Sequence, residues 1–160
     1  MAMTLALLLS GCASPPHEPA SDSVQQVWSG RLALNIASEP PQNTQAGFEL
    51  TGSARAGTLV LNGPLGTVAA TLHWAPGVAT LQKAGADMQH STSLEQLTVM
   101  ATGTSLPVGA MFDWLAGLKT PVAGWQVNQE NLGEGRLLLQ RTNPEPRARL
   151  LIVLDSPPDR

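Results

Sequence analysis

The chain has 160 residues, of which 42% are apolar and only 13% are charged, and its formal net charge at pH 7 is −3. This length suits a single domain, and the charge argues against a nucleic-acid-binding protein, which needs Lys and Arg to neutralise phosphates. Cys12 is the only cysteine, which excludes an intramolecular disulfide and a metal site built from cysteines.

The first feature along the chain is an apolar run over residues 3–9, followed by Ser10, Gly11 and Cys12. The run is much shorter than the ~20 residues that cross a bilayer, and it has the length of the apolar part of a secretory leader. The letters LSGC resemble a bacterial lipobox, although no Lys or Arg precedes the run. This resemblance implies a signal peptide over residues 1–11 and acylation of Cys12 by fatty acids such as palmitate. Several acyl chains on one residue anchor a protein stably.

Residues 12–27 hold this cysteine and a stretch rich in Pro, Ser and Ala, which is typical of a flexible tether. We expect the folded domain over residues 28–156 and a short tail over 157–160. Within the domain, apolar and polar residues alternate in short runs between turn residues, which predicts an antiparallel meander. The predicted strands cover residues 28–38, 46–52, 57–62, 67–74, 78–84, 124–129, 135–142 and 148–155.

Two of these strands carry further predictions about their faces. In the strand at 148–155, Leu151 and Val153 make the second face as apolar as the first, so we expect both faces to be covered. The strand at 67–74 has one apolar face, which comprises Val68, Ala70, Leu72 and Trp74.

The middle of the chain changes to a helical period. Residues 93–103 place Leu94, Leu97 and Met100 at three-residue steps, with Ser93 as a cap and Gly103 as a stop.

A second predicted helix follows over residues 108–118. Pro107 suits its first position, because that position has no helical partner for its N–H. Its apolar stripe comprises Val108, Met111, Phe112, Leu115 and Leu118, with Trp114 beside it.

No group of residues points to catalytic or metal chemistry. His17, His73 and His90 lie in different predicted elements, and no two of them have the spacing of metal ligands. The sequence contains neither a Gly-rich phosphate loop nor a nucleophile turn, and its carboxylates are scattered. We therefore expect no enzyme, no metal and no cofactor. A curled sheet with helices across one mouth has an apolar concave face, which forms either a ligand pocket or a filled core, and periodicity does not separate the two.

The stretch NGPLG, residues 62–66, joins two predicted strands and has the composition of a tight turn. Turns lie on the surface and are usually polar, yet Leu65 stands in the middle of this one. The residues alone leave two alternatives open: Leu65 folds back onto the sheet, or it projects from the hairpin.

Several motifs, taken in their order, resemble the LolB family of outer-membrane lipoprotein receptors. They are LSGC with its tether, GRLALNI at 30–36, LVLNGPLGT at 59–67, SLPVGAMFDWLAGL at 105–118 and RLLIVLDSP at 149–157. The resemblance covers residues 28–156. The segment between Leu118 and Gly124 is shorter than is usual in the family, and Leu50 stands where an aromatic residue is common.

The resemblance implies a mainly β fold, in which a curved antiparallel sheet forms an unclosed β-barrel with two or three short helices as a lid over a hydrophobic cavity. It further implies a lipid-anchored protein on the periplasmic face of the outer membrane. Such a protein accepts acylated lipoproteins from the soluble carrier LolA and inserts them among the phospholipids of that membrane. We expect it to act as a monomer.

The resemblance also assigns Pro64, Leu65 and Gly66 to a loop that delivers lipoproteins into the membrane. For the acyl-chain cavity we expect a lining of Leu34, Phe48, Leu50, Leu61, Leu72, Met100, Met111 and Trp114. Two other functions remain open at this point. One is an anchored structural or assembly lipoprotein with a filled core, and the other is a lipocalin-like carrier of a small apolar ligand.

Overall fold

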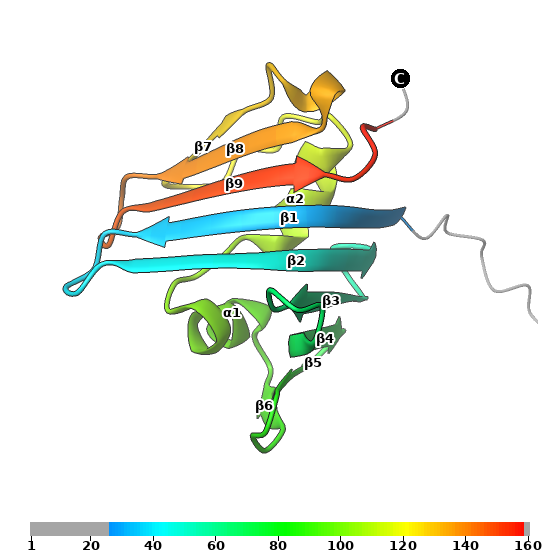
Figure 1. Ribbon diagram of the computed structural model, residues 1–160, viewed down its shortest axis with the longest axis vertical. Helices are drawn as coiled ribbons and strands as arrows, with labels where there is room; N and C mark the ends of the chain where they lie inside the picture. Colours follow the sequence, from blue (N-terminus) through cyan, green and yellow to red (C-terminus); the bar gives the residue numbers. More distant parts are fainter. Residues whose placement is uncertain (1–25, 159–160) are drawn as a thin grey trace, which may run out of the picture.

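Alternating apolar and polar residues fold most of residues 26–158, the part that the computed structural model describes, into strands (Figure 1). In this part nine strands form one sheet, in the order β6-β5-β4-β3-β2-β1-β9-β8-β7. The strands are β1 (Gln26–Ile36), β2 (Gln42–Gly52), β3 (Gly57–Asn62), β4 (Val68–Ala75), β5 (Val78–Lys83), β6 (Gln89–Ser91), β7 (Trp125–Asn128), β8 (Arg136–Arg141) and β9 (Ala148–Leu154).

Every pair of neighbouring strands is antiparallel, and the sheet begins and ends with strands that do not pair with each other in the described residues. β1 and β9 join the N-terminal meander to the C-terminal hairpin, with Leu34 opposite Leu150. The predicted antiparallel meander and the unclosed barrel are therefore confirmed.

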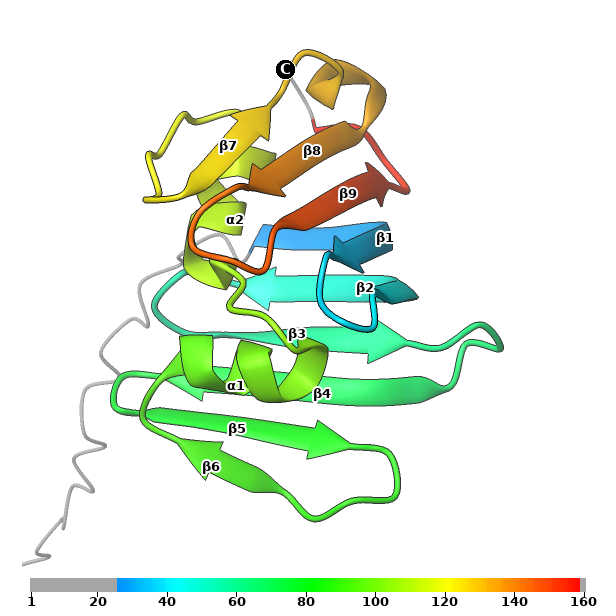
Figure 2. The same cartoon turned by 90° about the vertical axis from the view of Figure 1, so that its left-hand side faces the viewer.

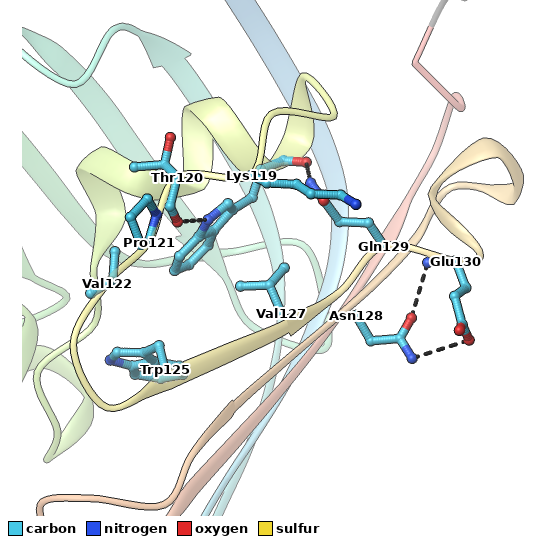
Figure 3. A pocket seen from close by; sticks show the side chains of 10 residues that line it. Lys119, Thr120, Pro121, Val122, Trp125, Val127, Asn128, Gln129 and Glu130 are labelled. Atoms are coloured by element: carbon cyan, nitrogen blue, oxygen red, sulfur yellow. Dashed lines mark hydrogen bonds between the residues drawn. The ribbon is translucent and has the colours of Figure 1, made fainter.

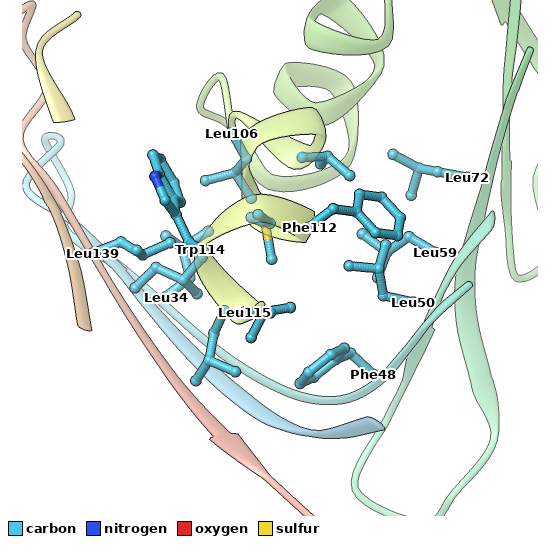
Figure 4. Close-up of a cluster of buried hydrophobic side chains, with 14 of the residues drawn as sticks. Leu34, Phe48, Leu50, Leu59, Leu72, Leu106, Phe112, Trp114, Leu115 and Leu139 are labelled. Carbon is cyan, nitrogen blue, oxygen red and sulfur yellow. The ribbon is translucent and has the colours of Figure 1, made fainter. Parts of the chain in front are cut away.

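Two α-helices lie on the same face of the sheet, α1 (Leu94–Thr102) and α2 (Val108–Leu115) (Figure 2). The sheet curves around the side chains of α2 (Figure 4). A 3-10 helix, η1 (Leu132–Glu134), lies in the connection between β7 and β8. The helices of the described part are too short to span a bilayer.

The core lies between the inner face of the sheet and these two helices. Leu50, Leu72 and Leu150 have no exposed surface, because each points from its strand toward the helix layer. Each fully buried side chain of this size contributes ~1.5–3 kcal/mol relative to an exposed one. The alternation predicted for β1, β2 and β3 is confirmed, since the inner positions are the buried ones.

The prediction that β9 is covered on both faces is wrong. Leu150 and Ile152 are buried, but Leu151 is 37% exposed and Val153 is 39% exposed. Both α-helices lie on the inner side of the sheet, so the outer face of β9 has no described element packed over it.

The prediction for β4 is wrong at its first residue. Ala70, Leu72 and Trp74 are buried as expected, whereas Val68 is 52% exposed. The pairing register shifts between Leu61 and Asn62, so that the alternation breaks at the start of the strand.

The domain boundary also differs slightly from the prediction. β1 begins at Gln26, two residues inside the predicted tether, and β2 begins at Gln42 rather than at residue 46. Backbone pairing to the whole length of β1 extends β2 through polar residues, because ladder hydrogen bonds need no apolar side chains. The predicted signal peptide and Cys12 lie outside the described residues, as does the end of the predicted tail.

Because successive strands run in opposite directions, successive turns lie at opposite ends of the sheet. The turns at 37–41, 63–67, 84–88 and 142–147 lie at one end, which we call the loop end. Gln26 and the turn at 76–77 lie at the other end. In Figure 2 the hairpin between β3 and β4 extends farther to the right than the turn between β5 and β6.

Candidate functional site

The helix layer is fixed at its first helix by two backbone caps. The Ser93 hydroxyl accepts the N–H of Gln96 at 3.4 Å, and Gly103, in the left-handed region with φ 81°, donates its N–H to the carbonyl of Val99 at 2.8 Å. The predicted start and stop of α1 are confirmed. The caps hold Leu97 against the sheet, where it has no exposed surface.

Met100 does not share this buried face, and 46% of its surface is exposed. An α-helix turns by about 100° per residue, so three-residue steps drift around the axis and carry Met100 away from Leu97. The predicted place of Met100 in the cavity is wrong for this reason. Thr98 takes the inward position instead, with its hydroxyl donating to the carbonyl of Glu95 and accepting the N–H of Leu106.

α2 has more buried side chains than α1 has. Its buried residues are Val108, Met111, Phe112, Trp114 and Leu115. The predicted stripe is confirmed except at Leu118, which lies beyond the end of the helix and is 57% exposed. Pro107 precedes the helix as its cap residue rather than opening it.

Between the helices and the sheet lies an enclosed cavity of about 60 Å³. Its walls come from five strands, from both α-helices and from the segment between them. The apolar lining residues are Leu32, Leu34, Ala46, Leu59, Leu61, Leu72, Ala101, Leu106, Val108, Met111 and Leu150. Three threonines complete the lining, and two of them, Thr98 and Thr102, hydrogen-bond to backbone groups.

The structure brings four of the predicted cavity residues to this space: Leu34, Leu61, Leu72 and Met111. Phe48, Leu50 and Trp114 are buried in the surrounding core but do not line it (Figure 4). Sequence reasoning did not single out Leu59, Leu106 and Leu150. Leu59 shares its predicted face with Leu61, and this signal could have found it.

The NGPLG hairpin holds Leu65 at its tip with 91% of the side chain exposed. The N–H of Gly63 donates to the carbonyl of Thr67 at 2.8 Å, and the N–H of Gly66 donates to the carbonyl of Gly63 at 2.9 Å. Gly66 has φ 74°, a conformation that favours glycine. These bonds close the turn beneath Leu65, which projects from it rather than folding back onto the sheet.

Other apolar side chains share the loop end with Leu65. Met88, in the turn after β5, is 51% exposed. Met100 reaches the same end, because its carbonyl accepts a hydrogen bond from Nζ of Lys83, the last residue of β5. The loop end therefore carries three exposed apolar side chains on three different elements, those of Leu65, Met88 and Met100.

A second, open space lies along the free edge of the sheet, between the segment that follows α2 and β7 (Figure 3). This β7 groove has a volume of about 570 Å³, and its apolar walls are Trp114, Pro121, Val122, Trp125 and Val127. Lys119 and Glu130 supply charges to its lining. Sequence reasoning did not find the groove.

The segment that forms one wall of the β7 groove is tied to α2 by hydrogen bonds. The Trp114 indole N–H donates to the carbonyl of Thr120 at 2.7 Å, and the Thr120 hydroxyl donates to the Asp113 carboxylate at 2.6 Å. From the other wall, the Gln129 amide donates to the carbonyls of Trp114 and Leu118 at 2.9 and 3.0 Å. These hydrogen bonds join the two walls of the groove at one end.

Arg141, on β8 directly opposite Trp125, is the most unusual buried group. Only 7% of the residue is exposed, and its guanidinium carbon lies 5.7 Å from the centre of the Trp125 ring. Nη1 and Nη2 donate to the carbonyls of Ser105 and Pro146 at 3.4 and 2.8 Å. Burial lowers the pKa of Arg141, and the Glu145 carboxylate opposes this shift, but the guanidinium stays protonated as arginines in proteins do.

The histidines and carboxylates of the described residues are scattered over the structure. In residues 26–158, no three His, Cys, Asp or Glu side chains gather as a metal site does. His73 is exposed, and its Nδ1 lies 3.2 Å from the hydroxyl of Thr58 on the neighbouring strand. His90 is exposed on β6, and His17 lies outside the described residues.

These features define a class of protein, an unclosed antiparallel β-barrel whose two helices cover an apolar interior. The sequence model of the family "Outer membrane lipoprotein LolB" matches residues 25–144. The outer-membrane lipoprotein LolB of Bordetella petrii is 31% identical over 183 aligned positions, which cover 98% of this chain and 92% of the relative.

Two further relatives carry the same name. LolB of Cellvibrio japonicus is 31% identical, covering 82% of this chain and 70% of the relative, and LolB of Chromobacterium violaceum is 32% identical, covering 74% and 67%. The chain belongs to the LolB family of outer-membrane lipoproteins. The protein is accordingly an outer-membrane protein that takes part in lipoprotein localisation.

Proposed function

We propose that this protein accepts lipoproteins from the soluble periplasmic carrier LolA, holds their acyl chains between the sheet and the helix layer, and inserts them into the outer membrane. The observation that carries the proposal is the enclosed, almost wholly apolar cavity beneath α1 and α2 in a chain of the LolB family. No catalytic step is needed, because the lipoprotein only changes its apolar surroundings.

The energetics favour a direct transfer between apolar sites. Each methylene of an acyl chain costs ~0.8 kcal/mol in water, so a chain of about 16 carbons gains roughly 10 kcal/mol or more from burial. Transfer from one apolar interior to another avoids exposing the chain. A difference in affinity between carrier and acceptor then drives the step without ATP.

The helix layer must move when an acyl chain enters. The closed cavity of about 60 Å³ is far below the ~300 Å³ at which ligand pockets begin. α2 faces the sheet through side chains such as Met111 and Phe112. Displacing these side chains, which are apolar themselves, exchanges one apolar contact for another and opens space for the chain.

Delivery into the bilayer is assigned to the loop end, with Leu65 as the foremost contact. A leucine moved from water into an apolar phase gains ~2 kcal/mol, and Met88 and Met100 add apolar surface at the same end. The tether attaches at Gln26, at the opposite end of the sheet. Gln26 is 14 positions after Cys12, and a fully extended segment of this length spans at most roughly 50 Å, more than the ~36 Å of an 11-residue strand such as β1.

The experiment is a two-stage transfer assay with the chain from residue 12 onward, carrying Cys12→Ala so that it bears no lipid. All described strands and helices lie within this chain. Acceptance is the amount of lipoprotein moved from LolA to the protein, and delivery is the amount moved on to liposomes. Leu65→Glu leaves acceptance unchanged and lowers delivery by ~30-fold or more, the factor that corresponds to ~2 kcal/mol.

Val78→Glu is the matched control, because Val78 is also an exposed apolar residue beside a hairpin turn, 44% exposed, but at the opposite end of the sheet. It leaves both stages unchanged. Normal delivery by the Leu65→Glu variant, or an equal loss with Val78→Glu, contradicts the assignment of the loop end to the membrane.

A second candidate function is an assembly lipoprotein whose core is simply filled. The small volume of the closed cavity favours it. A fluorescent apolar probe separates the two candidate functions. The proposed acceptor binds the probe, and an acylated peptide then displaces the probe from the protein. A filled core gives no displaceable binding.

A further inference from the structure

The outer face of the sheet carries exposed apolar side chains around β9. Leu151 is 37% exposed and Val153 is 39% exposed, and both point away from the face that the α-helices cover. Ala33 of β1 and Leu138 of β8 lie directly opposite Leu151. Apolar residues that adjoin one another on three strands indicate a contact surface, whereas single exposed ones do not.

Three arginines surround these apolar residues on the same face. Arg31 and Arg136 lie on either side of Val153, because each is directly opposite it in the pairing of β9 with β1 and with β8. Arg149 lies two residues before Leu151 on β9 itself. All three arginines are exposed, and none of them makes an ion pair with a described residue. We call Leu151, Val153 and these three arginines the arginine face.

Two carboxylates also lie on the outer face, but farther from the loop end. Glu49 is directly opposite Ser29, and the Asp155 carboxylate accepts the Ser29 hydroxyl at 2.9 Å. Ser29 stands two residues before Arg31, and β1 runs from there toward the loop end. The three arginines are therefore nearer the loop end than these two carboxylates, and they form a local group of positive charges in a chain whose net charge is −3.

The hairpin between β3 and β4 projects beside the arginine face. In Figure 2 this hairpin extends to the right, away from α2. An open groove of about 510 Å³ lies between the hairpin and the sheet, and its lining includes Pro64 of the hairpin together with Arg31 and Val153 of the arginine face. Leu65, 91% exposed at the tip of the hairpin, therefore projects on the same side of the sheet as the three arginines.

The spacing of the arginines suits a surface that carries many phosphate groups. With ~3.4 Å per residue along a strand and ~4.8 Å between strands, their Cα atoms lie roughly 10–14 Å apart. Side chains stand roughly perpendicular to a sheet, so the three guanidinium groups face a broad surface rather than converge on one ion. A second copy of the chain would bring arginines against arginines, which is unfavourable.

We propose that the arginine face is a docking surface for the headgroups of anionic phospholipids, and that it holds the domain against the bilayer while Leu65 enters it. Guanidinium groups bind phosphate through paired hydrogen bonds, and the groove beside the hairpin gives room for headgroups. The inference rests on the proposed function, in which the hairpin delivers lipoproteins, and it names the lipid class that the delivering surface recognises.

The test measures binding of the Cys12→Ala chain to two kinds of vesicle: phosphatidylcholine alone, and phosphatidylcholine with phosphatidylglycerol in equal parts. The chain binds the anionic vesicles more tightly, and added salt weakens this binding because it screens exposed charges. Arg31→Gln, Arg136→Gln and Arg149→Gln each lower the affinity for anionic vesicles roughly fivefold, and the triple variant lowers it about 100-fold, as expected for basic side chains at an anionic surface. The affinity for neutral vesicles is unchanged.

Arg55→Gln is the matched control. Arg55 is also an exposed arginine, but it lies in the turn between β2 and β3, at the opposite end of the sheet from the hairpin. Its substitution leaves binding to both kinds of vesicle unchanged. Leu65→Ala weakens binding to both kinds, since the contact of Leu65 with the apolar phase does not depend on lipid charge.

Each other outcome overturns the lipid surface. Equal affinity of the unmutated chain for the two kinds of vesicle does so, and so does normal binding of anionic vesicles by the triple variant. An equal loss on neutral vesicles shows that the arginines only support the fold. If the triple variant binds vesicles normally but no longer takes lipoprotein from LolA, the arginine face docks an acidic protein surface instead.

A second measurement leaves the three arginines in place. A polarity-sensitive fluorophore is attached through Val153→Cys in the Cys12→Ala chain, and its emission shifts to the blue on anionic vesicles. The same fluorophore attached through Leu118→Cys does not shift, because Leu118, although 57% exposed, follows α2 on the helix side of the sheet. Equal shifts at the two positions, or no shift at Val153, refute the orientation of the arginine face toward the bilayer.

The further inference and the proposed function fail separately. If the arginine variants bind anionic vesicles normally while Leu65→Glu still blocks delivery, the further inference falls and the proposed function stands. If the arginine variants lose vesicle binding as expected but the unmutated chain takes no lipoprotein from LolA, the proposed function falls and the lipid surface stands.

Discussion

A disulfide between α2 and the turn after β2 tests whether the helix layer has to move. Gly109 lies in the first turn of α2, and a Cβ placed on it would lie 3.6 Å from the Cβ of Ala54. This separation falls within the ~3.5–4.5 Å found across disulfides. The double variant Ala54→Cys/Gly109→Cys, made in the Cys12→Ala chain, therefore forms a bridge without moving the backbone far.

The bridge has two expected effects of known size. It closes a loop of roughly 55 residues, which stabilises the protein by ~4 kcal/mol in the chain-entropy account. It also holds the first turn of α2 at the distance of the closed state, where the cavity is about 60 Å³. Because an acyl chain needs several times that volume, the oxidised protein accepts lipoprotein from LolA at least ~10-fold more slowly than the reduced protein.

The assay measures acceptance before and after reduction with dithiothreitol, and the two single-cysteine variants serve as controls. A melting temperature that rises on oxidation shows that the bridge has formed. Equal acceptance by the oxidised and reduced forms, with the bridge formed, refutes the reasoning that α2 must leave the sheet at this end.

Three other substitutions test individual parts of the structure. Leu72→Ala enlarges the enclosed cavity and lowers the free energy of unfolding by ~2–5 kcal/mol, measured by urea titration. Ser93→Ala removes the cap of α1 and lowers it by ~1 kcal/mol in the same titration, and wild-type stability would exclude a role for the cap. Gly57→Ala places a Cβ 2.4 Å from the Thr51 carbonyl oxygen and 2.6 Å from the Trp74 ring, so it changes the fluorescence of Trp74. Gly63→Ala is the control, because the nearest atom to its Cβ, the Thr67 hydroxyl oxygen, is 3.6 Å away, and it changes neither fluorescence nor stability.

The inner face of the sheet could be predicted from the sequence because burial follows a period of two. Leu34, Phe48, Leu50 and Leu72 are buried as their alternation indicates. The caps of α1 could also be predicted, since a Ser hydroxyl caps a helix N-terminus and a Gly adopts the left-handed conformation that ends a helix. These features depend on a few neighbouring residues.

Features that depend on distant parts of the chain could not be read in this way. The outer face of β9 is apolar like a covered strand, yet Leu151 is exposed because both helices lie on the other side. Met100 fits a three-residue pattern but lies on the outer side of α1. Only the packing partner decides which of two apolar faces is covered.

The β7 groove and Arg141 belong to this second group. Trp125 and Arg141 are 16 positions apart in the sequence, and the antiparallel pairing of β7 with β8 brings them together. Arg141 stands in a polar-looking stretch, RTNPEP, and nothing local indicates that its guanidinium is buried. Its burial follows from the segment after α1, which supplies the carbonyl of Ser105.

The most direct test of the central claim locates the acyl chain of a lipoprotein on the protein. A lipoprotein with a photoreactive group in the middle of its acyl chain is loaded onto LolA, transferred to this chain and irradiated, and the cross-linked residues are identified by mass spectrometry. The account predicts cross-links to inner residues such as Leu34, Leu72 and Met111. Cross-links confined to the outer face, at Leu151 and Val153, would contradict it.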